Sequence, residues 1–174
     1  LLRVQFSAVL EADENFHGAL EQVQRALALS PPHAPLLWRR AQLRAAVRQD
    51  GWLAAALDDL DQAEALQGAT PAAQLIWDLV MVRAQVLEQG GRYDEAFRAL
   101  ARAEQRLAAQ GATALVATVL VRTLRLLRLT NDREAARQVL ERVLQRSVGM
   151  SADASGPLAA AARAWVDLEL GYHQ

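Results

Sequence analysis

The chain has 174 residues and a formal charge of −1, and its 19 cationic residues are all arginine. This balance argues against a broadly basic surface for nucleic acid or membrane. The absence of cysteine excludes disulfides, thiolate nucleophiles and cysteine-ligated zinc. Apolar residues make up 52% of the chain and aromatic residues only 5%, so alanine and leucine dominate and the composition favours helices.

Proline, glycine and asparagine residues at intervals along the sequence predict helices separated by short turns. In chain order the expected helices are 2–13, 16–29, 34–49, 52–67, 71–89, 92–109, 112–129, 132–147 and 155–170. The segments Ser30-Pro31-Pro32 and Thr70-Pro71 separate pairs of helices, and Pro71 suits a first helical turn. The dipeptides Asp50-Gly51, Gly90-Gly91 and Asn131-Asp132 separate the two helices of a pair.

Two internal registers recur along the chain with the same long period. The first, Ala-x3-[Val/Leu]-x2-[Ala/Val], begins at Ala19, Ala56, Ala96 and Ala136. Small residues at this spacing share one helix face and allow a neighbouring helix to approach closely, so we expect Ala56, Ala96, Ala103 and Ala136 to be buried where helices cross. The second register places one arginine in each unit, namely Arg3, Arg40, Arg83, Arg122 and Arg163. A helix pair that repeats in this way buries its apolar face only by stacking on the next pair.

Two segments carry a family resemblance. The run Gly91-Arg92-Tyr93-Asp94-Glu95-Ala96, continued by Leu100 and Ala103, resembles the second half of a tetratricopeptide repeat (TPR), and so does the segment 14–31. The resemblance implies an all-α, right-handed α-solenoid of antiparallel helix pairs, with first helices on the concave side. We expect a single domain of about four and a half units, at 1–31, 32–69, 70–110, 111–150 and 151–174.

The sequence also departs from that family. Its repeating unit is longer than that of the family, most first helices lack the family's Trp and Gly, and only one unit ends in proline. Long units of this kind resemble the sensor regions of large bacterial transcription activators.

Catalytic and metal-binding patterns are not evident, and we predict no enzyme, no cofactor and no metal site. His17, His33 and His173 lie too far apart to converge in an array, and Ser147, Ser151 and Ser155 have no histidine nearby to activate them. Gly90-Gly91 is a helix-ending turn and not a phosphate loop. The acidic run Asp58, Asp59, Asp61 and Glu64 is spread around its helix, which favours a solvated outer face over a metal site.

The arginines and tryptophans give the candidate partner-binding residues. These are Arg83, Arg122, Arg125, Arg128 and Trp38. Arginines of the second helices mostly have an acid one turn away, as in Arg25 with Glu21, Arg98 with Asp94 and Arg137 with Glu141, whereas the first-helix arginines mostly lack one. Two interpretations stay open: each first-helix arginine pairs with the adjoining helix pair, or the arginines bind an acidic peptide in a groove. Trp38 is either packed between helix pairs or an anchor for the partner.

We therefore predict a protein-interaction module that binds a peptide or a partner domain, with no nucleic acid and no membrane. The alternative is a ligand-sensing or self-association region of a bacterial transcription or signalling regulator. The lack of an initiator methionine and the turn-like end at Leu170–Gln174 predict a fragment of a longer array, which would self-associate through its last helix. The absence of a signal peptide or an apolar run of roughly 20 residues favours a cytoplasmic location.

Overall fold

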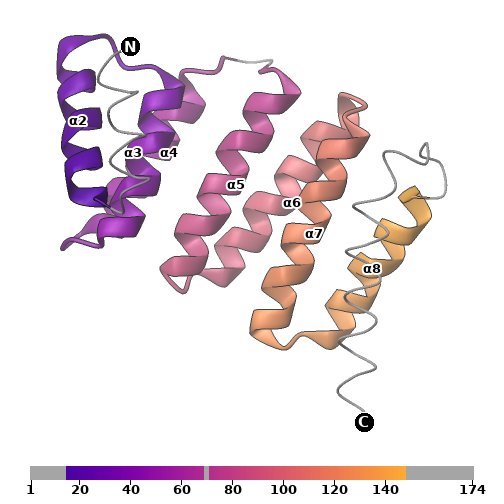
Figure 1. Ribbon diagram of the computed structural model, residues 1–174. Coiled ribbons are helices and arrows are strands. Elements are labelled where there is room, and N and C mark those ends of the chain that lie inside the picture. Colours follow the sequence, from indigo (N-terminus) through magenta and orange to yellow (C-terminus); the bar gives the residue numbers. More distant parts are fainter. Residues whose placement is uncertain (1–14, 69–70, 148–174) are drawn as a thin grey trace. The chain divides into compact units, whose positions relative to one another are not determined.

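The structure, a computed structural model, describes residues 15–68 and 71–147. This part of the chain contains seven helices and no strand (Figure 1). The helices are α2 (Phe16–Leu29), α3 (Ala34–Val47), α4 (Trp52–Ala65), α5 (Ala73–Gln89), α6 (Tyr93–Ala109), α7 (Thr113–Thr130) and α8 (Arg133–Ser147). The all-α prediction is confirmed, and each boundary lies within two residues of its predicted position. The helices predicted at 2–13 and 155–170 lie outside the described residues.

The chain divides into two compact units, Leu1–Ala96 and Phe97–Gln174. The division falls in the first turn of α6, so the first unit holds α2 to α5 and the second holds the rest of α6 with α7 and α8.

The last three described turns share one backbone design and are evenly spaced along the chain. Gly91, Gly111 and Asn131 adopt left-handed conformations with φ of 71°, 69° and 57°. The next residue in each case donates its N–H back to a leucine carbonyl: Arg92 to Leu87 at 2.8 Å, Ala112 to Leu107 at 3.0 Å and Asp132 to Leu127 at 3.1 Å. Glycine and asparagine tolerate this conformation, and the bond satisfies a carbonyl that the helix end leaves free. Residues at the turns themselves therefore determine where α5, α6 and α7 end.

Side chains cap the starts of α2 and α8, whereas α3, α4, α5 and α7 begin without a side-chain cap. The Asn15 Oδ1 caps α2 by accepting from the Gly18 N–H at 3.0 Å, and the Asp132 Oδ1 caps α8 by accepting from the Ala135 N–H at 3.0 Å. Pro35 lies in the first turn of α3. The prediction that Pro71 opens a helical turn is wrong, because α5 begins two residues later, at Ala73.

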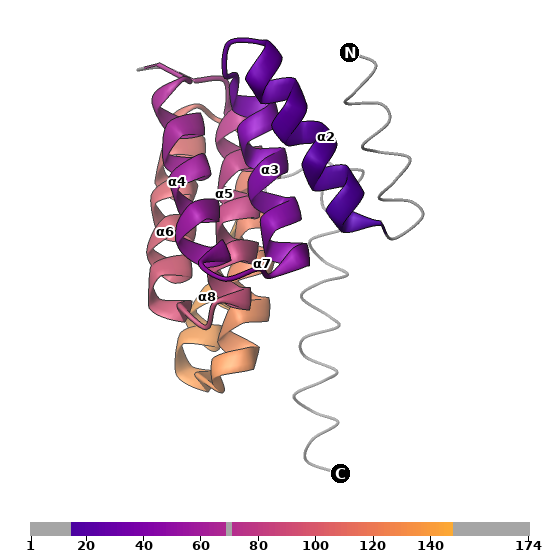
Figure 2. The same ribbon diagram turned by 90° about the vertical axis from the view of Figure 1, so that its left-hand side faces the viewer.

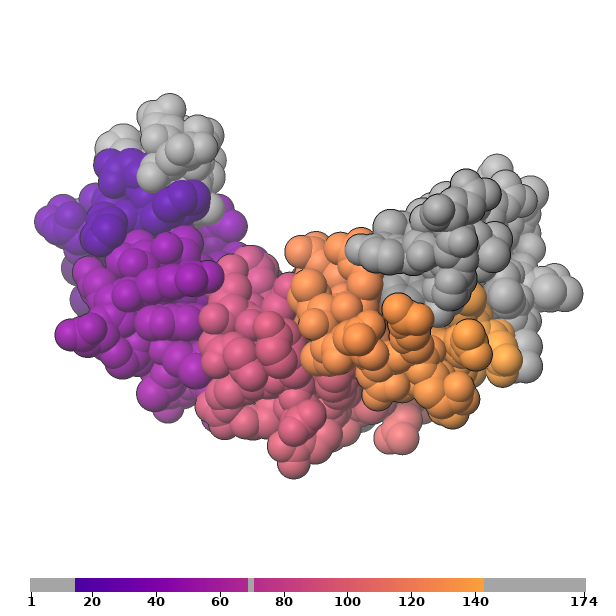
Figure 3. Space-filling model, turned by 90° about the horizontal axis from the view of Figure 1, so that it is seen from below, coloured from indigo at the N-terminus to yellow at the C-terminus, as the bar shows by residue number. Residues whose placement is uncertain are grey.

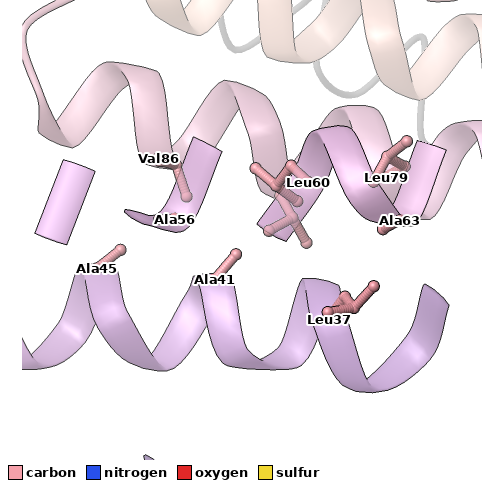
Figure 4. Close-up of a cluster of buried hydrophobic side chains, with 9 residues drawn as sticks. Leu37, Ala41, Ala45, Ala56, Leu60, Ala63, Leu79 and Val86 are labelled. Carbon is pink, nitrogen blue, oxygen red and sulfur yellow. The ribbon is translucent and has the colours of Figure 1, made fainter. Parts of the chain in front are cut away.

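The core of the first unit is built from alanine, leucine and valine side chains on three helices. In Figure 4, Leu37, Ala41 and Ala45 of α3 face Ala56, Leu60 and Ala63 of α4, and Leu79, Val82 and Val86 of α5 complete the cluster. Figure 2 shows α3 and α4 side by side, joined by the tight turn at Asp50 and Gly51. A second cluster joins α2 to α3 through residues such as Ala19, Val23 and Leu43. In the space-filling view, the indigo and purple residues of α2, α3 and α4 lie together in one contiguous body (Figure 3).

The predicted close-packing positions are confirmed in both units. Ala56, Ala96, Ala103 and Ala136 are all buried, with at most 4% of their surface exposed, and Ala19 of the same register is buried as well. In the second unit α7 packs against α8, and most of the apolar residues of α7 are buried. The recurring alanine register therefore marks the inner face of the helices that carry it.

Candidate functional site

Asp59 is the one charged residue among those described that is fully buried, with 0% exposure. It lies on α4 in the stripe Ala56, Asp59, Leu60, Ala63, where spacings of three and four residues put all of them on the inner face. The prediction of a solvated face holds for Asp58, Asp61 and Glu64, which lie outside this stripe, and is wrong for Asp59. The burial of Asp59 could have been predicted from the sequence, because Asp59 falls inside the alanine register.

Two arginines of α3 neutralise the buried carboxylate of Asp59. The Arg40 Nε donates to both carboxylate oxygens at 3.0 Å, and its Nη2 donates to Oδ1 at 2.5 Å. The Arg44 Nη1 donates to Oδ2 at 2.6 Å and to the Ala55 carbonyl at 2.6 Å. Both side chains are largely covered, with 19% and 22% exposed. The cluster contains two cations and one anion, so it carries an excess positive charge where the surroundings screen it poorly.

Arg83, a predicted partner-binding residue, is held by the helix before it. Its Nη2 lies 2.8 Å from the Asp61 Oδ1 and 3.3 Å from the Glu64 Oε2, and only 16% of the side chain is exposed. Arg83 therefore pairs with the adjoining helix pair, as one of the two interpretations expected, whereas Arg40 pairs with Asp59 on the second helix of its own pair. Arg3 and Arg163, the first and last arginines of the second register, lie outside the described residues.

The tryptophans are mostly part of the packing. Trp38, the other predicted anchor, is half-buried and packs against the α3–α4–α5 core cluster, as does Trp52. The Arg48 guanidinium lies over the Trp52 ring at 6.0 Å from its centre. Trp38 thus fits the packing interpretation of the two considered, and Trp165 lies outside the described residues.

A different arrangement holds for Arg122, Arg125 and Arg128 of α7, which we call the α7 arginine face. Their spacing of three residues places them along one side of the helix, and no acidic residue occurs anywhere in α7. Arg125 and Arg128 are exposed, and Arg122 is half-buried. Two of these three predicted partner-binding arginines are therefore exposed on a helix that contains no acid.

Charge is also distributed unevenly between the two units of the chain. Residues 97–147 contain ten arginines and four acidic residues, a formal charge of +6, although the whole chain is close to neutral. Residues 1–96 contain eight arginines and 13 acidic residues, a formal charge of −5. The exclusion of a basic surface from the total charge therefore does not extend to the second unit.

Other expected features are mixed in outcome. The Arg25–Glu21 pair forms as predicted, while Arg137 and Glu141, both exposed, form no ion pair in the described part of the chain. The pairing of Arg98 with Asp94 stays a prediction.

His17 and His33 are exposed and His173 lies outside the described ranges. Between residues 15 and 147, leaving out 69 and 70, no group of three or more metal-binding side chains gathers.

None of the described helices is both long enough and apolar enough to cross a bilayer. Comparison of the chain with protein-family models, with curated proteins and with solved structures finds no match.

Proposed function

We propose that the chain is a TPR-like, right-handed α-solenoid that acts as a protein-interaction module and binds an acidic segment of a partner protein. The solenoid part of the proposal draws support from the shared period of the two sequence registers, from the buried alanine in each described unit and from the repeated helix-ending turns. A stacked array of this kind offers long exposed helix faces, and such faces suit the recognition of extended or helical segments.

The observation that carries the interaction proposal is the α7 arginine face. The described part of the second unit has a formal charge of +6, and α7 presents the exposed Arg125 and Arg128 on a helix that contains no acid. By comparison, only 19%, 22% and 16% of the side chains of Arg40, Arg44 and Arg83 are exposed. Exposed guanidinium groups in a basic region attract carboxylates at long range and bind them through charge-assisted hydrogen bonds.

The spacing of the arginines suggests which form of partner fits best. Residues at i, i+3 and i+6 of a helix span about 9 Å along the axis. A partner helix with glutamates three or four residues apart presents carboxylates at a similar spacing, so it matches the α7 arginine face when the two helices lie side by side. Leu129, which is 49% exposed at the end of α7, provides an apolar contact beside the charged one.

The test is a binding titration of the full chain with a fluorescein-labelled, helix-forming peptide of about 20 residues whose glutamates recur at i, i+3 and i+7. The double variant Arg125→Glu/Arg128→Glu should lower its affinity by about tenfold or more. The matched control Arg137→Glu/Arg133→Glu reverses the same number of charges on exposed positions of α8 and should change affinity by less than about threefold. Equal losses in both variants would contradict a specific α7 site.

Two further measurements discriminate between classes of partner. Binding of the peptide should weaken as salt rises toward about 0.15 M, where charges more than about 8 Å apart are screened. Tighter binding of a single-stranded DNA oligonucleotide than of the peptide, with the same loss in the α7 variant, would replace the protein partner by nucleic acid.

The alternative function, a ligand-sensing or self-association region of a regulator, remains a prediction. The opposite charges of residues 1–96 and 97–147 are consistent with association between copies. Sedimentation at low and high salt tests this: an assembly that dissociates at high salt supports it, and a monomer at both contradicts it.

A further inference from the structure

A small pocket lies in the first unit beside the turn that joins α3 to α4. It encloses about 200 Å³, and side chains of α2, α3, the turn and α4 line it, including Gln24, Arg44, Gln49, Asp50 and Trp52. Pockets for drug-sized ligands usually measure about 300–1,000 Å³, so this pocket suits a smaller molecule. None of its lining residues belongs to the α7 arginine face, and the inference below therefore does not depend on the function proposed above.

Two opposite charges line this pocket without neutralising each other. Arg44 and Asp50 both contribute to its wall, yet they form no ion pair, and Asp50 makes no hydrogen bond through its side chain within the described part of the chain. A ligand that carries both a carboxylate and an ammonium group has a partner for each of its charges here.

Arg44 is preorganised for such a ligand. Its Nη1 is fixed by the Asp59 carboxylate and by the Ala55 carbonyl, both at 2.6 Å, while its Nε and Nη2 donate to no residue that the structure describes. Asp59 must also neutralise Arg40, so one buried carboxylate serves two guanidinium groups. A second carboxylate, supplied by a ligand, would balance the excess positive charge and use donors that are already held in place.

The remaining wall supplies neutral contacts. The amides of Gln24 and Gln49 can both donate and accept hydrogen bonds, and Trp52 and Leu20 add apolar surface. A group of mixed character on the ligand therefore fits better than a purely apolar one. A structural role for Asp50 also exists, because its charge lies next to the N-terminus of α4 and interacts favourably with the helix dipole.

We propose that this pocket binds a small zwitterion of the size of a free amino acid, with its carboxylate on Arg44 and its ammonium group on Asp50. If the chain is a ligand-sensing region, which is the alternative function above, this zwitterion would be the ligand that it senses. It makes a direct prediction about chemistry: a molecule that lacks either charge should bind much more weakly than one that has both.

The first experiment uses the full chain and the twenty free amino acids as probes, each at about 10 mM, with the melting temperature as the readout. At least one should raise the melting temperature, and isothermal titration should then give its affinity. The N-acetyl and the amide derivatives of that amino acid, which lack the ammonium and the carboxylate respectively, should bind at least about tenfold more weakly. Failure of all twenty to bind at this concentration would overturn the proposal.

Three variants locate the site. Asp50→Asn should weaken binding at least about tenfold, whereas the matched control Asp58→Asn, an acid of α4 that does not line the pocket, should leave it unchanged. Gln24→Trp starts from an exposed position of α2 and should abolish binding by filling the pocket while the melting temperature without ligand stays close to that of the parent. Parent-like affinity in both Asp50→Asn and Gln24→Trp would show that the amino acid binds elsewhere and would overturn the proposed site.

Discussion

Arg40 and Asp59 join α3 to α4 through a side-on ion pair, in which Nε and Nη2 of the guanidinium donate to the same carboxylate oxygen at 3.0 and 2.5 Å. The carboxylate has no exposed surface, so water cannot replace a lost donor. Burying a charge in this way is costly unless every bond is made, which makes the pair sensitive to the loss of either partner.

The first prediction concerns this buried carboxylate. Asp59→Asn leaves Arg40 and Arg44 without their counter-charge, so the free energy of unfolding should fall by about 3–5 kcal/mol. Asp58→Asn alters the neighbour, which is outside the core, and should cost less than about 0.5 kcal/mol. Urea denaturation of the two variants measures the difference. Similar midpoints for the two would show that the ion cluster contributes little to the fold.

The second prediction ranks two arginines that the sequence treats as equivalent. Arg83→Gln should cost no more than about 1 kcal/mol, because its partners Asp61 and Glu64 are 68% and 47% exposed and water can solvate them. Arg40→Gln should cost about 3 kcal/mol or more, because it leaves Asp59 underpaired in the core. The comparison requires only the free energies of unfolding, and the reverse order would contradict the burial argument.

The third prediction tests the alanine register. Ala56 has 0% exposure and faces Ala41 and Ala45, so Ala56→Leu should overpack the contact between α3 and α4 and cost about 1–3 kcal/mol. Ala54→Leu adds the same atoms on the exposed face of the same helix and should change stability by less than about 0.5 kcal/mol. Thermal denaturation of both variants provides the readout. Tolerance of leucine at Ala56 would mean that the helices do not pack as closely as Figure 4 shows.

The fourth prediction concerns the left-handed turns. Gly91 has a φ of 71°, and no atom lies within 4 Å of the position that a Cβ would occupy, so Gly91→Ala should cost about 1–2 kcal/mol through backbone strain alone. Asn131→Gly retains a residue that adopts the same conformation and should alter stability by less than about 0.5 kcal/mol. Chemical denaturation gives both values, and an unchanged Gly91→Ala variant would refute the strain argument.

The sequence by itself determined the ends of the described helices to within two residues and the buried face of the helices that carry the alanine register, α2, α4, α6 and α8. Glycine, asparagine and proline act within a few residues of where they stand, and the three-and-four spacing of alanine and leucine defines a face as soon as the segment is helical. Ala96 and Gly91 could therefore be placed correctly before the fold was known. Both positions depend on local chemistry and on a pattern that repeats along the chain.

The tertiary structure alone decided which charges meet between different helices. Asp59 differs from Asp58 by one position, which turns it toward the core, and its partners Arg40 and Arg44 lie 19 and 15 residues away on another helix. Spacing in the sequence predicts ion pairs only between neighbours on the same helix. The ion pairs of Arg83 with Asp61 and Glu64 depend instead on how α4 packs on α5. Long arginine side chains reach several acids at comparable energy, so only the packing of the helices, set by buried alanine and leucine, fixes which carboxylate each guanidinium contacts.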